Sequence, residues 1–423
     1  MRNWYRSVFY TLGVVSLVAV LAACGSGSTG GGGGGSSNLK PGTICIGTEL
    51  PTTGTDGSEG QPAENGVDLA VMQNASLPDG FKLQVRNFND VSPQTGLHDG
   101  PTGAQNVQQM VTTNCILAFV GPFNSGVAGA EIPVAAKAGL AMISPANTNP
   151  GLTLSQYATQ YGFNYASLHP SGSPNVYFRI PANDVVQGKV DADYMIDTLN
   201  AKSVYVVDDT EPYGKGLADF FEQEFKSRSG TDLGRDEISS KTTSQLPALV
   251  AKIVAAKPDA VFYGGVTSEG GGLLKAQLVQ AGFTGAMVGG DGIAEDSAFL
   301  TQAGAGANNT HGTVAAPDLS TFTAGVQSKF VSDYKAQFNA DPGPYSANSF
   351  DAAMIEINAI KSLIAAGTQP TRATVLNAIA HIDYTGVTGH ITFDQNGDNA
   401  GNKVFSIYEV VNGKWQFVKS VSA

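Results

Sequence analysis

The chain has 423 residues, enough for two or three domains with buried cores. It carries 24 lysine and arginine residues against 36 aspartate and glutamate residues, a net charge of −12 at pH 7. Nucleic-acid phosphates attract clustered basic side chains, and no basic run occurs beyond the first few residues. The charge balance therefore argues against nucleic acid as a partner.

The N-terminus predicts export from the cytoplasm. Arg2 and Arg6 are followed by an apolar run at residues 9–20 and then by small residues, the pattern of a secretory signal. The run is shorter than an ordinary membrane-spanning helix. Leu-Ala-Ala followed by Cys24 resembles the lipobox of bacterial lipoproteins, which implies that Cys24 is acylated and begins the mature chain. The alternative is a cleaved signal with a chance cysteine.

A Gly/Ser-rich tract directly follows Cys24 and favours the lipoprotein interpretation. Such a tract is a flexible tether with an r.m.s. span of roughly 20 Å. We therefore expect residues 1–23 to be a signal peptide and residues 24–40 to be the lipidated cysteine and its tether. The protein is then extracytoplasmic, anchored to the outer face of the cell membrane or periplasmic.

After the tether, short apolar runs alternate with segments of helical periodicity. The runs predict strands at residues 43–50, 81–88, 116–120, 141–143, 203–207, 260–263 and 286–288. Helical spacing of apolar residues separates them, as in the helix predicted at Ser125–Ala138. This alternation predicts parallel sheets covered by helices on both faces.

The fold class expected is α/β, with two Rossmann-like lobes. An irregular stretch at residues 152–175 and a junction near residues 180–183 separate two strand–helix blocks. Further helices and a hairpin-like run at residues 389–418 follow the second block, which indicates lobes built from discontinuous segments. The lobes expected are residues 41–181 with 315–388, and residues 182–314 with 389–423. Ligands in such folds bind at the C-terminal ends of the strands, so two facing lobes form a central cleft.

Cys45 and Cys115 are the two cysteines left after Cys24. Both lie at or near the start of a predicted strand, so a disulfide can form if those strands are neighbours. An oxidising compartment permits it. Two buried free thiols are the alternative, and both interpretations stay open because the sequence does not give the Cα separation that a bridge requires.

Several motifs occur in order along the chain. They are residues 120–125, 142–150, 207–217, 263–265, 289–292 and 389–398. In this order they resemble the Leu/Ile/Val-binding protein family, the extracytoplasmic solute receptors of branched-chain amino-acid ABC importers. The resemblance implies a type I periplasmic-binding fold with a three-stranded hinge. It also implies a monomer that delivers a small molecule to an ABC permease and is not an enzyme.

The candidate carboxylate contacts lie in the first lobe. Ser125 follows a strand and begins a helix, so it is a plain N-cap or an anion contact, because a helix start attracts negative charge. The resemblance implies a contact with a ligand carboxylate at Ser125. It implies further carboxylate contacts through the backbone N–H of Ala146 and through the N–H and hydroxyl of Thr148. The alternative for both is an ordinary loop turn.

The candidate ammonium contacts lie in the second lobe. Asp291 stands in Gly-Gly-Asp-Gly after a strand, and its alternative is a turn residue. The resemblance implies that Asp291 accepts the ligand ammonium, although family members often carry glutamate there. It also implies that Tyr213 is an aromatic contact in the cleft, whereas packing against its own helix is the alternative.

Two departures from the family pattern leave the ligand open. Val266-Thr267 follow Gly264-Gly265 where the family often has an aromatic hydroxyl, and the loop at residues 56–60 is polar. We expect a branched-chain-like amino acid or a related small carboxylate. An amide, urea-like or aromatic-acid solute is the alternative, as is sensing rather than import. The aromatic residues of 152–175 form either a lid or a surface flap.

Other signals do not indicate chemistry. The five histidines are scattered without metal-ligand spacing, and no nucleophile or nucleotide motif stands in the right context. Asp394 to Asp398 partly matches a calcium loop but lacks its later acidic residue, and a turn at Asn396-Gly397 explains it better. We therefore expect no metal and no cofactor. An extracytoplasmic enzyme and a structural surface lipoprotein are the rival classes.

Overall fold

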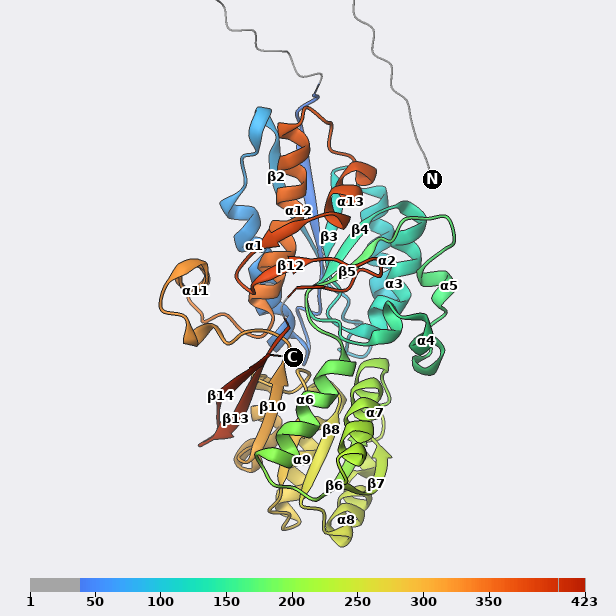
Figure 1. Ribbon diagram of the computed structural model, residues 1–423, viewed down its shortest axis with the longest axis vertical. Coiled ribbons are helices and arrows are strands. Elements are labelled where there is room, and N and C mark those ends of the chain that lie inside the picture. The colour runs from blue at the N-terminus through green and yellow to red at the C-terminus, as the bar shows by residue number, and fades with distance from the viewer. Residues whose placement is uncertain (1–38, 402, 423) are drawn as a thin grey trace, which may run out of the picture. The chain divides into compact units, whose positions relative to one another are not determined.

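Two β-sheets organise the chain in the computed structural model, which describes residues 39–401 and 403–422 (Figure 1). The predicted signal peptide, Cys24 and nearly all of the predicted tether lie outside the described residues. Residues 39–423 make up a single compact unit. None of its described helices combines the length and the hydrophobicity needed to cross a bilayer.

The first sheet has five parallel strands in the order β2-β1-β3-β4-β5. Their bounds are β1 (Thr43–Glu49), β2 (Lys82–Phe88), β3 (Ile116–Val120), β4 (Ala141–Ser144) and β5 (Tyr177–Arg179). All five residues of β3 are buried, as expected for an apolar strand that is covered on both faces.

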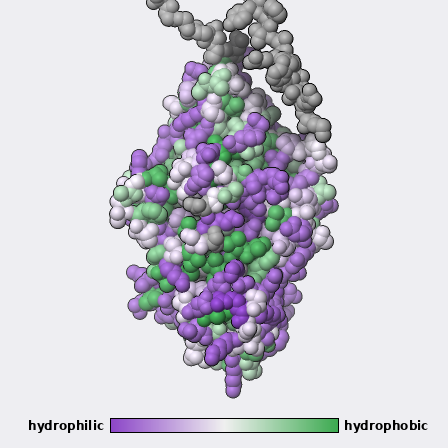
Figure 2. Space-filling view, viewed as in Figure 1, coloured by the Kyte–Doolittle hydropathy of each residue, from purple (hydrophilic) through white to green (hydrophobic). Residues whose placement is uncertain are grey.

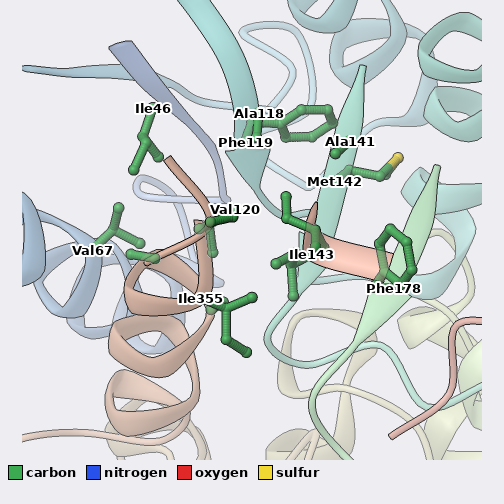
Figure 3. Close-up of a cluster of buried hydrophobic side chains, with 14 of the residues drawn as sticks. Ile46, Val67, Ala118, Phe119, Val120, Ala141, Met142, Ile143, Phe178 and Ile355 are labelled. Carbon is green, nitrogen blue, oxygen red and sulfur yellow. The ribbon is translucent and has the colours of Figure 1, made fainter. Parts of the chain in front are cut away.

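Helices from both ends of the chain cover the first sheet. They are α1 (Gly57–Gln73), α2 (Gly100–Thr112), α3 (Ser125–Ala138), α12 (Ser346–Ala365) and α13 (Arg372–Ala380). In Figure 3, Val67 of α1 and Ile355 of α12 lie close to side chains of the strands, among them Val120. Burying one such aliphatic side chain contributes about 1.5–3 kcal/mol relative to exposure.

The second sheet has seven strands in the order β14-β13-β10-β9-β8-β6-β7, and only β13 and β14 run antiparallel to their neighbours. The strands are β6 (Ser203–Asp208), β7 (Thr231–Glu237), β8 (Ala260–Gly264), β9 (Ala286–Gly289), β10 (Thr310–Val314), β13 (Val404–Val411) and β14 (Lys414–Ser422). The accompanying helices are α6 (Asp184–Asp197), α7 (Pro212–Ser227), α8 (Leu246–Ala256), α9 (Gly271–Gln280) and α10 (Ser297–Ala303).

The chain passes between the two sheets three times: after β5, after β10 and after the short strand β12 (His390–Thr392). β12 pairs with β11 (Asp383–Thr385), and its Ile391 packs in the core of the first sheet. The remaining helices are α4 (Ser155–Ala158), α5 (Tyr165–Leu168) and α11 (Gly325–Phe338). Figure 2 shows hydrophobic side chains gathered on one face over the region where the chain passes between the sheets.

Cys45 and Cys115 lie side by side at the centre of the first sheet. Cys45 is in β1 and Cys115 immediately precedes β3, the strand that pairs with β1. Their Cα atoms are 5.0 Å apart and their sulfurs form a disulfide that spans 70 residues of sequence. A crosslink of this kind stabilises a fold by roughly 2–4 kcal/mol.

The predicted irregular stretch at residues 152–175 is largely folded. Tyr161, Phe163 and Leu168 are buried in the core of the first sheet. Tyr157, in the same segment, packs edge-on against Phe220 of α7 with ring centroids 5.3 Å apart. The side chain of Gln160 donates to Asp219, also in α7, at 2.9 Å. The segment is therefore a packed bridge from the first lobe to α7 of the second.

Candidate ligand-binding site

The N-terminus of α3 offers unpaired backbone donors. The N-cap Asn124 makes no side-chain capping bond, and the first helical hydrogen bond runs from the Ala128 N–H to the Asn124 carbonyl. The N–H groups of the first turn therefore have no acceptor within the helix. Ser125, the first helical residue, is 2% exposed and its Oγ accepts from the Asn149 N–H at 3.3 Å. This helix start suits a carboxylate.

The loop after β4 brings Ala146 to the same place, but not Thr148. The Ala146 N–H points to Ser144 Oγ at 3.3 Å, and Ala146 lines the cavity that Ser125 lines. Thr148 is fully buried and does not line that cavity. Its hydroxyl has no hydrogen-bond partner among the described residues, while its carbonyl accepts from the Asp184 N–H at 2.9 Å.

Tyr213 and Asp291 meet across from α3. Tyr213 is in the first turn of α7, and its hydroxyl donates to Asp291 Oδ1 at 3.0 Å and accepts from the Gly292 N–H at 3.1 Å. Asp291 follows β9 and also accepts from the Gln187 amide at 2.7 Å and, through Oδ2, from the Tyr345 hydroxyl at 2.8 Å. Burial raises the pKa of Asp291, and these hydrogen bonds partly offset the rise.

The two halves of the site are closed over a small cavity with a volume of about 20 Å³, room for about one water molecule. Four of the five predicted contacts line it. The lining residues are His98, Phe123, Asn124, Ser125, Gly126, Ala146, Asp209, Glu211, Tyr213, Val266, Asp291 and Gly292. Direct bonds cross between the lobes beside it: Asn149 Nδ2 donates to the Pro212 carbonyl at 2.5 Å, and Ser58 Oγ donates to Asp296 at 2.6 Å.

Three further residues at this site were not predicted from the sequence. Gln187 lies inside α6 and Tyr345 is the N-cap of α12, and both donate to Asp291. His98 lies in the loop before α2 and lines the cavity. Tyr345 also packs edge-on against Phe123, with ring centroids 5.7 Å apart.

His98 is a buried cation in the cleft wall. Burial lowers the pKa of His98, but its bond to Asp56 (Nδ1 to Oδ2, 3.0 Å) and the charges of Asp56, Asp90 and Glu211 outweigh that effect and raise it to about 9. The same pairing lowers the pKa of Asp56 despite burial. His98 and Asp56 therefore form a charged pair at neutral pH.

We expect this pair to make stability depend on pH. The unfolded pKa of His98 is 6.5 and the folded value about 9, so the stabilisation is complete below pH 6.5 and is lost as pH rises through 9. The shift corresponds to about 3 kcal/mol. Denaturant unfolding between pH 6 and pH 10 should show this loss in the wild type and not in His98→Gln. Identical pH profiles for the two proteins would contradict the assignment.

No metal centre is evident at this site. Across residues 39–401 and 403–422, no group of three or more histidine, cysteine, aspartate or glutamate side chains is arranged to hold a metal ion. Of the acidic residues beside the cleft, Asp296 accepts from the N–H groups of Ala298 and Phe299 at the start of α10.

Comparisons with known proteins identify the family of this chain. A family model described as periplasmic binding protein matches residues 43–414. The Leu/Ile/Val-binding protein BraC3 of Rhizobium johnstonii is 28% identical over 90% of this chain and 94% of its own length. Leu/Ile/Val-binding protein homolog 1 of Brucella abortus is 26% identical over 89% of this chain and 93% of its own.

Solved structures show the same architecture. The branched-chain amino acid transporter substrate-binding protein LivJ of Streptococcus pneumoniae, solved with isoleucine, is 26% identical and covers 90% of this chain and 100% of its own, with a TM-score of 0.75. A leucine-binding protein of Thermotoga maritima, at 24% identity, reaches a TM-score of 0.76 over 89% of this chain and 98% of its own. The predicted α/β fold and the resemblance are both confirmed: the chain belongs to the periplasmic binding protein family, among relatives named for binding leucine, isoleucine and valine.

Proposed function

We propose that this protein captures an amino acid of the branched-chain type, or a closely related small carboxylate, outside the cytoplasm and delivers it to an ABC permease. The names of its relatives support this role. Cys24 would anchor the protein to the membrane by its acyl chains, and the protein would act as a monomer without enzymatic activity. The protein binds its ligand between two lobes built on the two sheets.

One observation carries the proposal. The cavity has a helix start with free N–H groups at one end, at Ser125, and a buried carboxylate at the other, at Asp291. An amino acid has the complementary charges at its two ends. Removing one member of a buried charge pair costs several kcal/mol. A ligand with only one of these charges would therefore leave either the start of α3 or the Asp291 carboxylate without a partner.

Ligand binding would be coupled to lobe closure. In the closed arrangement, Asn149, Ser58 and Tyr345 of the first lobe contact the second lobe, and the cavity of about 20 Å³ is too small for an amino acid. The ligand must therefore enter an open form, and its contacts with both lobes then favour the closed form. The three chain crossings between the sheets form the hinge for this motion. In the closed form Thr148 is buried and does not line the cavity, so we assign it to the site only in the open or liganded form.

The alternative ligand class is an aromatic acid. A solute-binding protein of Rhodopseudomonas palustris solved with benzoate has a TM-score of 0.70 at 18% identity, which shows the shared fold. Benzoate would engage the start of α3 but has no ammonium for Asp291. An amide or urea-like solute would offer Asp291 donors but no carboxylate for α3. A cavity with a carboxylate site at Ser125 and an ammonium site at Asp291 therefore favours an amino acid over either class. This holds whether the protein serves import or sensing.

A thermal-shift screen of the purified protein tests the proposal. Leucine, isoleucine and valine are expected to raise the melting temperature, since a ligand that binds only the folded state stabilises it by RT ln(1 + [L]/Kd). Leucinamide, which lacks the carboxylate, and 4-methylvaleric acid, which lacks the ammonium, should shift it much less. Equal shifts for leucine and 4-methylvaleric acid would show that Asp291 does not receive an ammonium.

Ser125→Ala is expected to weaken amino-acid binding about 10-fold to 150-fold. It removes a hydroxyl bond to the carboxylate, and bonds to charged groups contribute about 1.5–3 kcal/mol. Isothermal titration with the strongest ligand of the screen measures the change in Kd. Ser297→Ala is the matched control, because Ser297 is also the first residue of a helix but is exposed and outside the cavity. Equal affinities for the two variants would contradict the carboxylate assignment.

A further inference from the structure

The ligand cavity has polar lining residues that neither the carboxylate site at Ser125 nor the ammonium site at Asp291 uses. They are His98, Asn124, Asp209 and Glu211. Asp209 is satisfied within the protein, because its Oδ1 accepts from the Glu211 N–H at 3.0 Å and its Oδ2 from the Val266 N–H at 2.9 Å. The other three residues keep hydrogen-bonding groups that the closed protein does not satisfy.

The carboxamide of Asn124 is buried without a partner for its oxygen. Asn124 is the N-cap of α3 and is 8% exposed, but its side chain makes no capping bond. Its Oδ1 has no hydrogen-bond partner among the described residues, and its Nδ2 is a donor on the same group. A buried acceptor without a donor is unfavourable. A ligand that supplies the donor would remove this cost.

Glu211 and His98 add opposite charges to the same lining. Glu211 is the N-cap of α7 and lies across the cleft from α3, where a Cβ atom placed on Gly126 would be 3.1 Å from Glu211 Oε2. In the described part of the chain, the Glu211 side chain makes no capping bond and no ion pair. His98 is charged and bonds to Asp56 through Nδ1, so its Nε2 is a further donor.

These two charges select against a charged ligand side chain. A cationic group would be attracted by Glu211 and repelled by His98, and an anionic group would meet the reverse. A neutral group that both donates and accepts hydrogen bonds satisfies the two residues together. The lining therefore favours a neutral polar side chain on the ligand.

The cleft continues past these residues into an outer cavity of about 520 Å³. His98, Gly126 and Glu211 line both cavities, so they form the boundary between them. About half of the outer lining is polar or charged, including Thr210, Ser240 and Lys241. A ligand side chain at this boundary therefore has polar surroundings and room for an additional methylene.

A carboxamide fits these partners better than a hydroxyl or an aliphatic group. Two acceptors lack donors, Asn124 Oδ1 and the Glu211 carboxylate, and an NH₂ group has two donors whereas a hydroxyl has one. The carbonyl of the same carboxamide would accept from Asn124 Nδ2 or from His98. An aliphatic side chain leaves Asn124 unpaired, and a site with buried hydrogen-bonding groups discriminates strongly against such a ligand.

We propose that amino acids with a carboxamide side chain, asparagine and glutamine, are ligands of this cleft and bind more tightly than the aliphatic amino acids. Asn124 and Glu211 are then the residues that select the side chain. This inference rests on the proposed function, because it takes the ligand carboxylate at Ser125 and the ligand ammonium at Asp291.

Isothermal titration of the purified protein with asparagine and with leucine tests this inference. The two amino acids have nearly the same shape and differ in whether the side chain ends in a carboxamide or in two methyl groups. Asparagine is expected to bind about 10-fold to 150-fold more tightly than leucine, because leucine leaves the Asn124 acceptor unpaired. Aspartate, the anion of the same shape, should bind at least tenfold more weakly than asparagine, since Glu211 repels it.

Asn124→Leu is expected to lower the ratio of asparagine affinity to leucine affinity at least tenfold. Asn183→Leu is the matched control and should keep the wild-type ratio. Asn183 is also an N-cap residue without a capping bond and with an unpartnered Oδ1 among the described residues, but it lies outside the cavity. Because the readout is a ratio, a general change in lobe closure leaves it unaffected.

The outcomes separate this inference from the proposed function. If leucine binds and asparagine binds no more tightly, or if Asn124→Leu keeps the wild-type ratio, the side-chain assignment is overturned and the amino-acid cleft stands. Equal affinities for asparagine and aspartate also overturn it. If neither leucine nor asparagine binds, both fail. Should Asn124→Leu not fold, Glu211→Ala takes its place: it should lower the ratio at least threefold, and an unchanged ratio overturns the inference.

Discussion

Replacing Asp291 with asparagine is expected to raise the Kd for the amino acid roughly 30-fold to several thousand-fold. Truncating or neutralising one partner of a buried, hydrogen-bonded charge pair costs about 2–5 kcal/mol, and each 1.4 kcal/mol is a factor of ten. Asp291 is 5% exposed, so water does not compensate the ligand ammonium when the carboxylate is lost. Asparagine keeps the shape but replaces one acceptor oxygen by an NH2 group, so the loss reports the charge together with one of the hydrogen bonds that Asp291 accepts.

The unliganded protein should tolerate this change. Burial raises the pKa of Asp291, which means that the empty folded state disfavours its charge. Neutralising it is therefore expected to leave the free energy of unfolding unchanged or slightly higher. Asp197→Asn, on the exposed face of α6, removes the same charge far from the cavity and should leave Kd unchanged. If Asp291→Asn and Asp197→Asn bind the amino acid equally well, the ammonium contact lies elsewhere.

The same residue predicts how binding depends on pH. A bound ammonium needs the ionised carboxylate, and burial holds the pKa of Asp291 in the empty protein above the usual value for an aspartate. As pH falls through that raised pKa, the carboxylate is protonated and affinity falls. Titrations between pH 4 and pH 7 should show this decline in wild type and a flatter profile in Asp291→Asn.

The parts of the fold that were predictable are those in which local sequence and burial agree. β3 and the helix Ser125–Ala138 lie where the apolar patterns predict them, because a strand covered on both faces is apolar throughout and a covered helix is apolar at helical spacing. β7 was missed because it is the polar edge of the second sheet, with no fully buried residue. β5 was missed because it has three residues.

The C-terminal hairpin shows a related limit. A turn does form at Asn396-Gly397, with the Gly397 N–H donating to the Asp394 carbonyl at 3.0 Å. The longer hairpin of β13 and β14, however, turns at Asn412-Gly413, where both residues have positive φ, as a type I′ turn requires. Both turns have the sequence Asn-Gly, so the local sequence does not distinguish them. The pairing of β13 with β10 determines that the hairpin at Asn412-Gly413 is the one that joins the second sheet.

The candidate site also contains some residues that could be predicted from the sequence and others that could not. Ser125 and Asp291 stood out because each follows a predicted strand, where ligands bind in this fold class. Ala146 and Tyr213 came only from the family resemblance, and all four line the cavity. Gln187 and Tyr345 donate to Asp291 across 104 and 54 residues of sequence. No local pattern encodes such separations, since they depend on how the lobes are folded and closed.

Asp398→Asn is expected to lower the free energy of unfolding by about 3–5 kcal/mol, the cost of leaving a buried charge without its partner. That partner is Arg179, the last residue of β5, whose side chain is fully buried and whose Nε donates to Asp398 Oδ1 at 2.6 Å. The other guanidinium nitrogens donate to the Asn149 carbonyl at 2.8 Å and to Thr153 Oγ1 at 2.7 Å.

The pair joins two of the three chain crossings, because Arg179 ends the strand before the first crossing and Asp398 lies in the third. The Arg179 N–H also donates to the Gly397 carbonyl at 3.1 Å. Loss of the Asp398 charge therefore leaves the fully buried guanidinium of Arg179 without a charged partner. Asp398 itself is 17% exposed and can be hydrated. Denaturant unfolding measures the loss, and Asp341→Asn, in the exposed pair with Lys335, should change stability by no more than about 0.5 kcal/mol.

A double-mutant cycle isolates the charge itself. Arg179→Met combined with Asp398→Asn removes both charges, so the double variant should be more stable than the sum of the two single losses predicts. If the losses simply add, the guanidinium is held by its bonds to Asn149 and Thr153 alone. A loss in Asp398→Asn no larger than in Asp341→Asn would mean that the carboxylate does not compensate Arg179, and that the hinge is held by its backbone bonds.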